Sequence, residues 1–504
     1  MKLLTADQQR RAEAETITHA PIASIALMER AAEACTAAIL KKFPSADFLV
    51  VCGMGNNGGD GLAIARLLAQ QQCSSAIALI RHREKMSSDT RTNLNRLKEM
   101  NISITEISSE KQLQLHLTEN TVIIDALLGN GINRPPDGLL RTTIESVNQS
   151  QYPVISIDVP SGLPIDSLPQ KGDAIIRATY TLALHQPKRS FLFPESAPFT
   201  GSWEILDIGI NTQSIADKEI NTFFTTFEDL TPFLLPREQF SHKGTHGHAL
   251  LISGSKGKVG AAVLAATACL HSGAGLLTLH APECAYTILQ TTTPEAMVSV
   301  DKNEEVITQL PDIGPYHAIG IGPGIGQNAE TALVLKQLIQ NSGAPLVLDA
   351  DALNILAENR TWLSFLPAGT IITPHPKEFD RLTEKHQDSC SRLTSAQQLA
   401  RKHQIYVVLK GAFTAVVCPN DKVWFNSTGN AALARGGSGD ILTGLITGLL
   451  ARGYSSFQSA LLGTYLHGLA ADLATKQIHP EALRLTQLFP YVSAAFEILY
   501  DGRK

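Results

Sequence analysis

The stretch FLVVCGMGNNGGDG (residues 48–61) decides the fold of the first half of this chain. A short apolar run, typical of a buried parallel strand, leads directly into a glycine-rich turn, and LAIARLLAQ (residues 62–70) predicts a helix after it. Glycines allow a tight turn, and the free N–H groups at the start of a helix attract an anion. The segment therefore predicts a strand, a turn for a nucleotide-like anion, and a helix.

Apolar runs of this kind recur along the chain, separated by helical stretches, and they predict an open parallel α/β sheet in each half. In the first half, a helical pair (residues 6–42) precedes the strands FLVVCG, SSAIALIR, TVIIDALLG, PVISIDVPSG and ATYTLAL. Strand character is lost between residues 211 and 239, where we place a domain boundary. The second half has the strands HALLISGS, GLLTLHAP, AIGIGPG, PLVLDAD, TIITPHP and IYVVLKG, and it turns strongly helical after Gly439.

The composition is that of an ordinary globular protein of 504 residues. Its 42 Lys and Arg against 47 Asp and Glu give a net charge of −5, and without a concentrated basic region nucleic-acid binding is disfavoured. Seven scattered cysteines without a C-x-x-C pair argue against a disulfide framework or a zinc site and favour the cytoplasm. We expect neither a signal peptide nor a membrane span, because the most apolar stretch (residues 261–279) is interrupted by Gly, Ser and His.

Polar residues at three predicted strand ends of the first half indicate one binding site. Their carboxylate, amide and hydroxyl oxygens can ligate a hard cation, and a carboxylate can move a proton. The aspartates could instead be helix caps, and the glycines could serve packing alone. Arg81, His82 and Arg83 stand where a dinucleotide fingerprint has an acidic residue, which disfavours a plain NAD-dependent dehydrogenase. The candidates are Asn56, Asn57, Asp60, Asp125, Asp158 and Ser161.

The motifs GMGNNGGDG (residues 53–61), DALLGNGINRP (125–135) and DVPSG (158–162) resemble the N-terminal epimerase domain of the bifunctional NAD(P)H-hydrate repair enzymes. The resemblance implies a Rossmann-like three-layer domain that interconverts the R and S forms at C6 of a hydrated nicotinamide ring. Asp158 is our candidate for the proton transfer. The resemblance implies a potassium ion on Asn57, Asp125 and Ser161, and it places the hydrated cofactor against Asn56, Asn57, Gly58, Gly59, Asp60, Gly129, Asn130, Gly131, Ile132, Asn133, Arg134, Pro135 and Asp158.

GNAALARGGSGDILTG (residues 429–444) predicts a second site. Its glycines allow a tight turn before a helix that opens at about Asp440, so helix N–H groups would face a phosphoryl group and Asp440 would reach a substrate hydroxyl. The loops TPHPKEF (373–379) and KGAFT (410–414) place His375 for hydrogen bonding or proton exchange and Lys410 for a diphosphate.

Two other sequence patterns of the second half could indicate a function, but the sequence argues against both. GSKGKVGA (residues 254–261) lacks the G-K-[ST] of a Walker ATPase, which excludes that activity. A metal site on His242, His246 and His248 is disfavoured because no carboxylate supports it.

The second half resembles the ribokinase-like fold and, more closely, the ADP-dependent NAD(P)H-hydrate dehydratase domain of the same enzymes. Lys377 and the pair at residues 431–432 depart from the residues usual there. The domains would be 1–215 (epimerase), 216–234 (linker) and 235–504 (dehydratase). The resemblance assigns Ala261, Gly324, His375 and Asp440 to the hydrated cofactor, and Lys410, Gly411, Ala412, Phe413, Thr414 and Gly439 to the adenine nucleotide.

Together these features predict a bifunctional enzyme of nicotinamide nucleotide repair. The first half would epimerise hydrated NADH and NADPH, and the second would dehydrate the S form with ADP, giving AMP and phosphate. Because hydroxide leaves poorly, we expect phosphorylation of the C6 hydroxyl, with Asp440 as base, residues 436–439 as phosphoryl cradle and Mg²⁺ as charge neutraliser. We expect a homo-oligomer that acts on small molecules.

Two other interpretations remain open on the sequence. The second half could be a ribokinase-like kinase of a vitamin-like alcohol fused to a nucleotide-binding domain, in which case a stable phosphorylated product would form. The whole chain could instead be a nucleotide-binding scaffold, which would leave its ligand unchanged.

Overall fold

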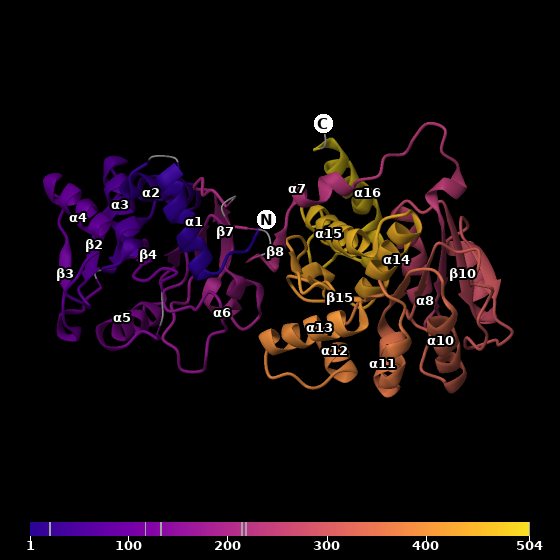
Figure 1. Cartoon of the computed structure of the whole chain (residues 1–504). Coiled ribbons are helices and arrows are strands. Elements are labelled where there is room, and N and C mark those ends of the chain that lie inside the picture. Colours follow the sequence, from indigo (N-terminus) through magenta and orange to yellow (C-terminus); the bar gives the residue numbers. More distant parts are fainter. Residues whose placement is uncertain (20–21, 116, 132–133, 213–214, 217–218, 503–504) are drawn as a thin grey trace. The chain divides into compact units, whose positions relative to one another are not determined.

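The structure, a computed structural model, describes residues 1–504 except 20–21, 116, 132–133, 213–214, 217–218 and 503–504. It forms two compact units: an N-terminal unit, Lys2–Ile220, and a C-terminal unit, Asn221–Lys504 with Met1 (Figure 1). The division falls inside the stretch that we expected to be a linker. All seven cysteines are free, and no described helix is long and apolar enough to cross a membrane.

The N-terminal unit contains a seven-stranded sheet in the order β3-β2-β1-β4-β5-β6-β7, and every neighbouring pair is parallel. All five strands expected in this half are present, and β3 and β7 are additional. The strands are β1 Asp47–Cys52, β2 Ser75–Ile80, β3 Thr105–Ile107, β4 Thr121–Ala126, β5 Val154–Ile157, β6 Tyr180–Leu184 and β7 Ser202–Leu206.

Helices cover both faces of this sheet, which confirms the predicted three layers. Alternate residues of β1 face opposite ways. Leu49 and Val51 pack with α5 (Gly138–Gln149) on one face of the sheet. Helix α3 (Asn56–Gln70) lies on the opposite face, where it contacts Cys52. The other helices are α1 Ala6–His19, α2 Ser24–Lys42, α4 Ser88–Glu99 and α6 Ala197–Thr200.

Helix α3 begins earlier than the sequence suggested. We expected it from residue 62, but it begins at Asn56, so the glycine-rich motif forms its first turns. Glycine costs about 1 kcal/mol relative to alanine in a helix. However, a Cβ at Gly58 would lie 2.0 Å from the carbonyl oxygen of Gly53, so only glycine allows the helix to start so close to the end of β1.

The C-terminal unit contains a ten-stranded sheet in the order β11-β10-β9-β12-β13-β14-β15-β16-β17-β8. The strands from β11 to β15 are parallel, and β16 runs antiparallel to both its neighbours. Our expectation of no strand between residues 211 and 239 was wrong, because β8 pairs with β17. The strands are β8 Thr222–Thr225, β9 His248–Ile252, β10 Leu276–Ala281, β11 Met297–Val300, β12 Ala318–Ile321, β13 Leu346–Leu348, β14 Ile371–Ile372, β15 Tyr406–Leu409, β16 Ala415–Val417 and β17 Val423–Asn426.

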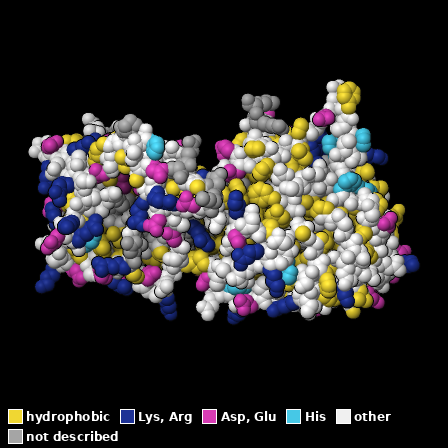
Figure 2. Space-filling model, in the orientation of Figure 1, with side chains coloured by type: hydrophobic (Ala, Val, Ile, Leu, Met, Phe, Trp, Pro, Cys, Tyr) yellow, Lys and Arg dark blue, Asp and Glu magenta, His cyan; other side chains and the backbone are white. Residues whose placement is uncertain are grey.

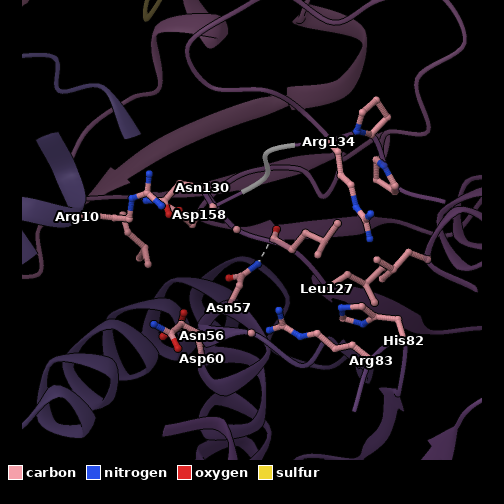
Figure 3. Close-up of a pocket in the computed structure, with 18 of the residues that line it drawn as sticks. Arg10, Asn56, Asn57, Asp60, His82, Arg83, Leu127, Asn130, Arg134 and Asp158 are labelled. Carbon is pink, nitrogen blue, oxygen red and sulfur yellow. Dashed lines mark hydrogen bonds between the residues drawn. The ribbon is translucent and has the colours of Figure 1, made fainter. Parts of the chain in front are cut away.

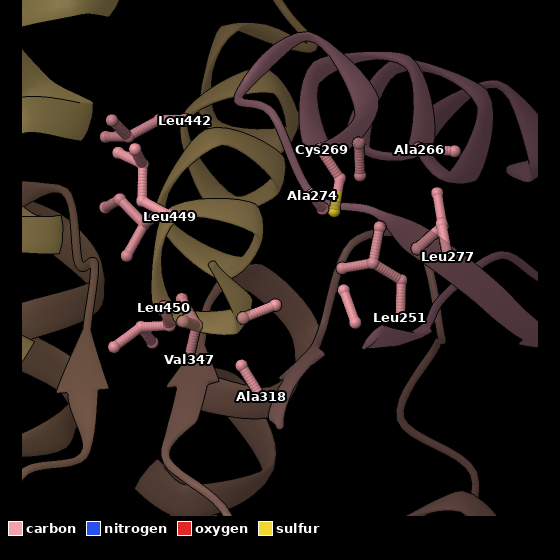
Figure 4. Packing of buried hydrophobic residues seen from close by; sticks show 14 of the residues in the cluster. Leu251, Ala266, Cys269, Ala274, Leu277, Ala318, Val347, Leu442, Leu449 and Leu450 are labelled. Carbon is pink, nitrogen blue, oxygen red and sulfur yellow. The ribbon is translucent and has the colours of Figure 1, made fainter. Parts of the chain in front are cut away.

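A dry core fixes α14 (Ser438–Ala451) over this sheet. Leu442, Leu449 and Leu450 of α14 pack with α8 (Val259–His271) and with apolar residues of β9, β10, β12 and β13 (Figure 4). The two helices approach closely, since a Cβ at Gly444 would lie 2.1 Å from a carbonyl oxygen of α8. The core thereby holds the amino end of α14, which carries the second glycine turn, above the sheet.

The remaining helices of the C-terminal unit complete its layers, and α10 to α13 lie in a row in Figure 1. The strongly helical end that we predicted after Gly439 is confirmed by α14, α15 and α16. The remaining helices are α7 Phe227–Leu230, α9 Tyr286–Thr292, α10 Ala329–Asn341, α11 Ala350–Glu358, α12 Pro376–Leu382, α13 Ser389–His403, α15 Ser456–Ala474 and α16 Phe489–Asp501.

Candidate active sites

The first candidate site is a cavity of about 680 Å³ in the N-terminal unit (Figure 3). It lies at the ends of β1 and β4, where the strand order changes direction, and open parallel sheets bind ligands at such a point. Gly58 and Gly59 are buried in α3 and do not line it, and residues 132–133 lie outside the described residues. The predicted residues that line it are Asn56, Asn57, Asp60, Gly129, Asn130, Gly131, Arg134, Pro135 and Asp158.

The three predicted potassium ligands are linked in one network beside this cavity. The Asp125 carboxylate accepts hydrogen bonds from the Ser161 hydroxyl (2.5 Å), the Ser161 amide (2.9 Å) and the Ser156 hydroxyl (2.7 Å). Both Ser161 and Asn57 bind the backbone of Leu128. Burial raises the pKa of Asp125, and these hydrogen bonds oppose the rise. The buried Oδ1 of Asn57 has no hydrogen-bond partner in the described part of the chain.

Asp158 forms a buried ion pair. Its Oδ1 lies 2.6 Å from the Nζ of Lys188, which is 1% exposed and also donates to the carbonyl of Leu184. Asp158 has a φ of +67°, a left-handed conformation that costs a non-glycine residue energy. The strained backbone and the ammonium together fix where this carboxylate points.

Glu13, Asp60 and Asp137 also line the same cavity. Burial raises the pKa of Asp60, and the charge of Asp158 raises it further. Burial also raises the pKa of Glu13, and its hydrogen bond from Gln9 opposes the rise. The cavity therefore combines one ion-paired carboxylate with two that hold protons more strongly than usual.

The second candidate site is a cavity of about 830 Å³ in the C-terminal unit. It extends from the end of β15 to the glycine turn before α14. The predicted residues that line it are His375, Lys410, Gly411, Ala412, Phe413, Thr414 and Gly439.

His375 caps α12 with its side chain. Its Nδ1 accepts from the amides of Lys377 (3.1 Å) and Glu378 (3.2 Å), so the ring proton of the neutral imidazole is on Nε2. Burial lowers the pKa of His375, which favours this neutral form. His375 lines the cavity, and its Nε2, which carries the proton, lies 3.5 Å from the Glu378 carboxylate.

Lys410 and Asp349 form an ion pair below the glycine turn. The Lys410 Nζ lies 2.9 Å from one Asp349 oxygen, and the Thr443 hydroxyl donates to the other at 2.9 Å. Burial alone would raise the pKa of Asp349, but the Lys410 charge leaves it lowered. A Cβ at Gly439 would lie 3.2 Å from the Lys410 Nζ, so this glycine lets the helix start against the ion pair.

Asp440 lies one residue further along α14 and has no salt-bridge partner in the described residues. Burial raises its pKa to about 7, the charge of Asp349 adds to the rise, and Lys410 opposes it. At neutral pH this carboxyl group is therefore poised between its acid and base forms.

Asp440, Ala261 and Gly324 are not among the described residues that line the second cavity, although Asp440 directly follows Gly439, which lines it. Ala261 and Gly324 lie together, because a Cβ at Gly324 would be 3.1 Å from that of Ala261. Asp351 forms a salt bridge with Lys258, with 3.1 Å between the carboxylate oxygen and Nζ, and its negative charge raises the pKa of Asp440. The predicted cofactor residues thus form a group beside the nucleotide cavity, with His375 inside it.

Two family models match the chain in the expected order. Residues 24–190 match the model described as YjeF-related protein N-terminus, and residues 249–493 match the one described as NAD(P)H-hydrate dehydratase. The bifunctional NAD(P)H-hydrate repair enzyme Nnr of Moorella thermoacetica is 34% identical over 515 residues, which cover 98% of this chain and 96% of that protein. The chain belongs to the bifunctional NAD(P)H-hydrate repair enzymes.

Another enzyme of this family and a solved dehydratase structure are also similar to the chain. The enzyme of the same name from Escherichia coli is 32% identical over 488 residues, covering 96% of this chain and 92% of that protein. A crystal structure of the ADP/ATP-dependent NAD(P)H-hydrate dehydratase from Bacillus subtilis, co-crystallized with ATP/Mg²⁺, is 32% identical, with a TM-score of 0.47, and covers 55% of this chain and 99% of that chain. The resemblance drawn from the motifs is confirmed for both halves.

Three charged residues of this repair enzyme escaped the sequence analysis. Lys188 is the single lysine in HQPKRS, which follows a buried strand, and that position is the only signal it gave. Asp349 and Asp351 end the strand PLVLDAD, the same pattern that singled out Asp125 and Asp158. The pattern was visible there, but no glycine motif adjoined it.

We predict that Lys188→Met lowers the free energy of unfolding of the N-terminal unit by about 3–5 kcal/mol, because it leaves the Asp158 carboxylate buried without a counter-charge. Asp158→Asn combined with Lys188→Met should recover most of this loss. Urea unfolding with hydrogen–deuterium exchange of β5 and β6 measures the effect, and exposed Lys111→Met is the matched control. A double variant as unstable as the single one would contradict the ion pair.

Proposed function

We propose that the chain epimerises the R and S forms of hydrated NADH and NADPH in its N-terminal unit and dehydrates the S form with ADP in its C-terminal unit. One observation carries the proposal: the chain matches the repair enzymes over nearly its whole length, and each unit places an aspartate and a glycine-rich helix start at a cavity or directly beside one. An acidic group and a preorganised helix start are what both reactions need.

In the epimerase unit, Asp158 takes part in the proton transfer and stabilises the positive charge of the ring. Inversion at C6 breaks the bond to the hydroxyl oxygen, which leaves as water after gaining a proton, and water then adds to the other face of the cationic ring and loses a proton. The Lys188 ion pair holds the Asp158 carboxylate in place, where it can stabilise the cation. Asp60, which holds a proton more strongly, is suited to donate it.

The residues beside this cavity fit a potassium ion. The unpartnered oxygen of Asn57 lies in the same network as the carboxylate of Asp125 and the hydroxyl of Ser161, and hard cations take such oxygen ligands. When bound, the ion supplies a fixed positive charge. Asp125 and Ser161 hold the loop after β4 in position beside the cavity.

In the dehydratase unit, Asp440 removes the proton of the C6 hydroxyl as its oxygen attacks the terminal phosphorus of ADP. AMP leaves, then the C6–O bond breaks and phosphate departs with its electron pair. Loss of the C5 proton restores the double bond. The amides at residues 436–439 hold the phosphoryl group, and Lys410 to Thr414 bind the nucleotide.

The nucleotide cavity suits Mg²⁺ bound mainly through the nucleotide. No Asp or Glu is among the described residues that line it, so phosphate oxygens and water would supply the ligands. Mg²⁺, when bound, neutralises phosphate charge. Lys410 adds a hydrogen-bond donor from the protein, while Asp349 and Glu378 balance its positive charge.

The whole proposal is tested by incubating the full chain with a mixture of R and S hydrated NADH and with Mg²⁺ and ADP. We expect absorbance to recover for both epimers, with one AMP and one phosphate per NADH. Without the protein, recovery should not depend on ADP. A stable phosphorylated product, or no recovery with ADP, would contradict the proposed reactions.

Asp440→Asn should lower dehydration of the S form by about 10²–10⁴-fold, because it removes the base, while epimerisation continues. Asp158→Asn is the reciprocal control and should lose epimerisation but keep dehydration of the S form. Because the base must be deprotonated and its pKa is raised to about 7, wild-type dehydration should rise with pH up to about 7 and then level off. Loss of both activities in either variant would refute independent sites.

Replacing K⁺ with an equal concentration of N-methylglucamine should slow epimerisation about tenfold or more, because the Asn57 oxygen loses its cation. K⁺ should also raise the Tm of the N-terminal unit in the wild type but not in Asn57→Leu. Calorimetry of both proteins in both buffers measures this. An equal K⁺ response in the two proteins would rule out Asn57 as a ligand.

A further inference from the structure

The cavity of the N-terminal unit has a basic end and an acidic end. Figure 3 shows His82 and Arg134 on one side of the cavity, with Arg83 next to His82, and Asp158 and Asp60 on the other. Arg10 lies on the side of Asp158 and is paired with Asp7. The acidic end carries the chemistry proposed above. Of this basic end, only Arg134 was expected to contact the hydrated cofactor, and no particular group of the cofactor has been matched to it or to Arg83.

The guanidinium groups of Arg83 and Arg134 have no acidic partner among the described residues. Arg81, by contrast, lies in an ion pair with Glu106 at 2.5 Å and does not line the cavity. Asp137 also lines the cavity but forms no ion pair with either arginine. Burial and the charge of Arg83 lower the pKa of His82, and the charge of Asp137 opposes this. The two arginines therefore present free positive charge to the cavity.

Arg83 also lies against the start of α3. Its Nη2 would be 3.3 Å from a Cβ placed on Gly55. Gly55 is the N-cap residue of α3 and has no side chain that could accept a hydrogen bond from the helix amides. The amides of the first helical turn have no acceptors within the helix. Positive charge from the side chain and from the helix end thus converges beside the glycine motif.

The sheet order tells which part of a nucleotide reaches Arg83. When a diphosphate lies on the helix start after the first strand, the adenosine ribose lies over the end of the neighbouring strand. That neighbour is β2, which ends at Ile80, and Arg83 follows it. An acidic residue at this place would bind a ribose 2′-hydroxyl, whereas an arginine accommodates a 2′-phosphate. Glu84 does not line the cavity.

We propose that Arg83, with Arg134, binds the 2′-phosphate of hydrated NADPH and makes the epimerase unit favour hydrated NADPH over hydrated NADH. This inference rests on the proposed function of the N-terminal unit. The diphosphate, which both substrates share, is bound by the start of α3, so the arginines act on the one group that distinguishes them. Two guanidinium groups suit a dianionic phosphate because each can bind it with two hydrogen bonds.

The test measures epimerisation of each hydrate separately, without ADP, by chromatographic separation of the R and S forms. We expect the wild-type KM to be about tenfold lower for hydrated NADPH. Arg83→Gln should raise that KM about tenfold or more, with kcat unchanged and the KM for hydrated NADH within twofold. Arg134→Gln should act in the same direction. Arg81→Gln, at the ion-paired neighbour, should change neither value.

The outcomes separate this inference from the proposed function. If wild type epimerises neither hydrate, the proposed function fails. If wild type is active but Arg83→Gln raises both KM values equally, Arg83 binds the shared diphosphate and the inference is overturned. Unchanged values for hydrated NADPH in both arginine variants would overturn it as well. Raised salt should lower the preference of the wild type, since the contact is electrostatic.

Discussion

Both sites depend on a helix that begins close against the end of a strand, where glycine leaves the room that a side chain would take. At α3 the obstacle is the carbonyl of Gly53, and at α14 it is the ion pair of Lys410 and Asp349. This close approach leaves the unpaired amides of each helix start without a side chain in front of them, which suits the anionic ligands proposed for both sites. It also explains why glycines persist within helical turns, where they lower helix stability. The packing of α14 on α8 holds this geometry in the C-terminal unit.

The two catalytic candidates, Asp158 and Asp440, are both largely buried, but only Asp158 has a salt-bridge partner among the described residues. Asp158 is paired with a buried ammonium, which suits a carboxylate that has to face a cationic ring. Asp440 has no such partner, and its pKa of about 7 suits a base that must take up a proton and release it in each turnover. The charge of Asp349 raises that pKa, so the ion pair that stabilises the glycine turn also tunes the base.

Local patterns predicted much of this structure, and tertiary contacts account for the rest. Buried parallel strands such as β1 and β9 were visible because apolar runs end in glycine motifs. The hairpin strands β16 and β17 and the lone strand β8 lack that signal, since they are ordered by pairing with distant residues. The start of α3 was missed because glycine disfavours helices unless close packing requires it. Lys188 was missed because its partner lies thirty residues away in the sequence.

An epimerase faces a constraint that a dehydratase does not. It must hold both configurations at C6, so contacts that grip the C6 hydroxyl in one orientation would slow turnover of the other form. Its binding free energy is therefore better drawn from parts of the substrate that do not react. The cavity of the N-terminal unit matches this requirement, because the unpaired Arg83 and Arg134 lie away from Asp158, and Arg83 lies beside the start of α3. The proposed dehydratase reaction can instead select one epimer, since its base, Asp440, lies in the first turn of a helix and has to reach a single hydroxyl.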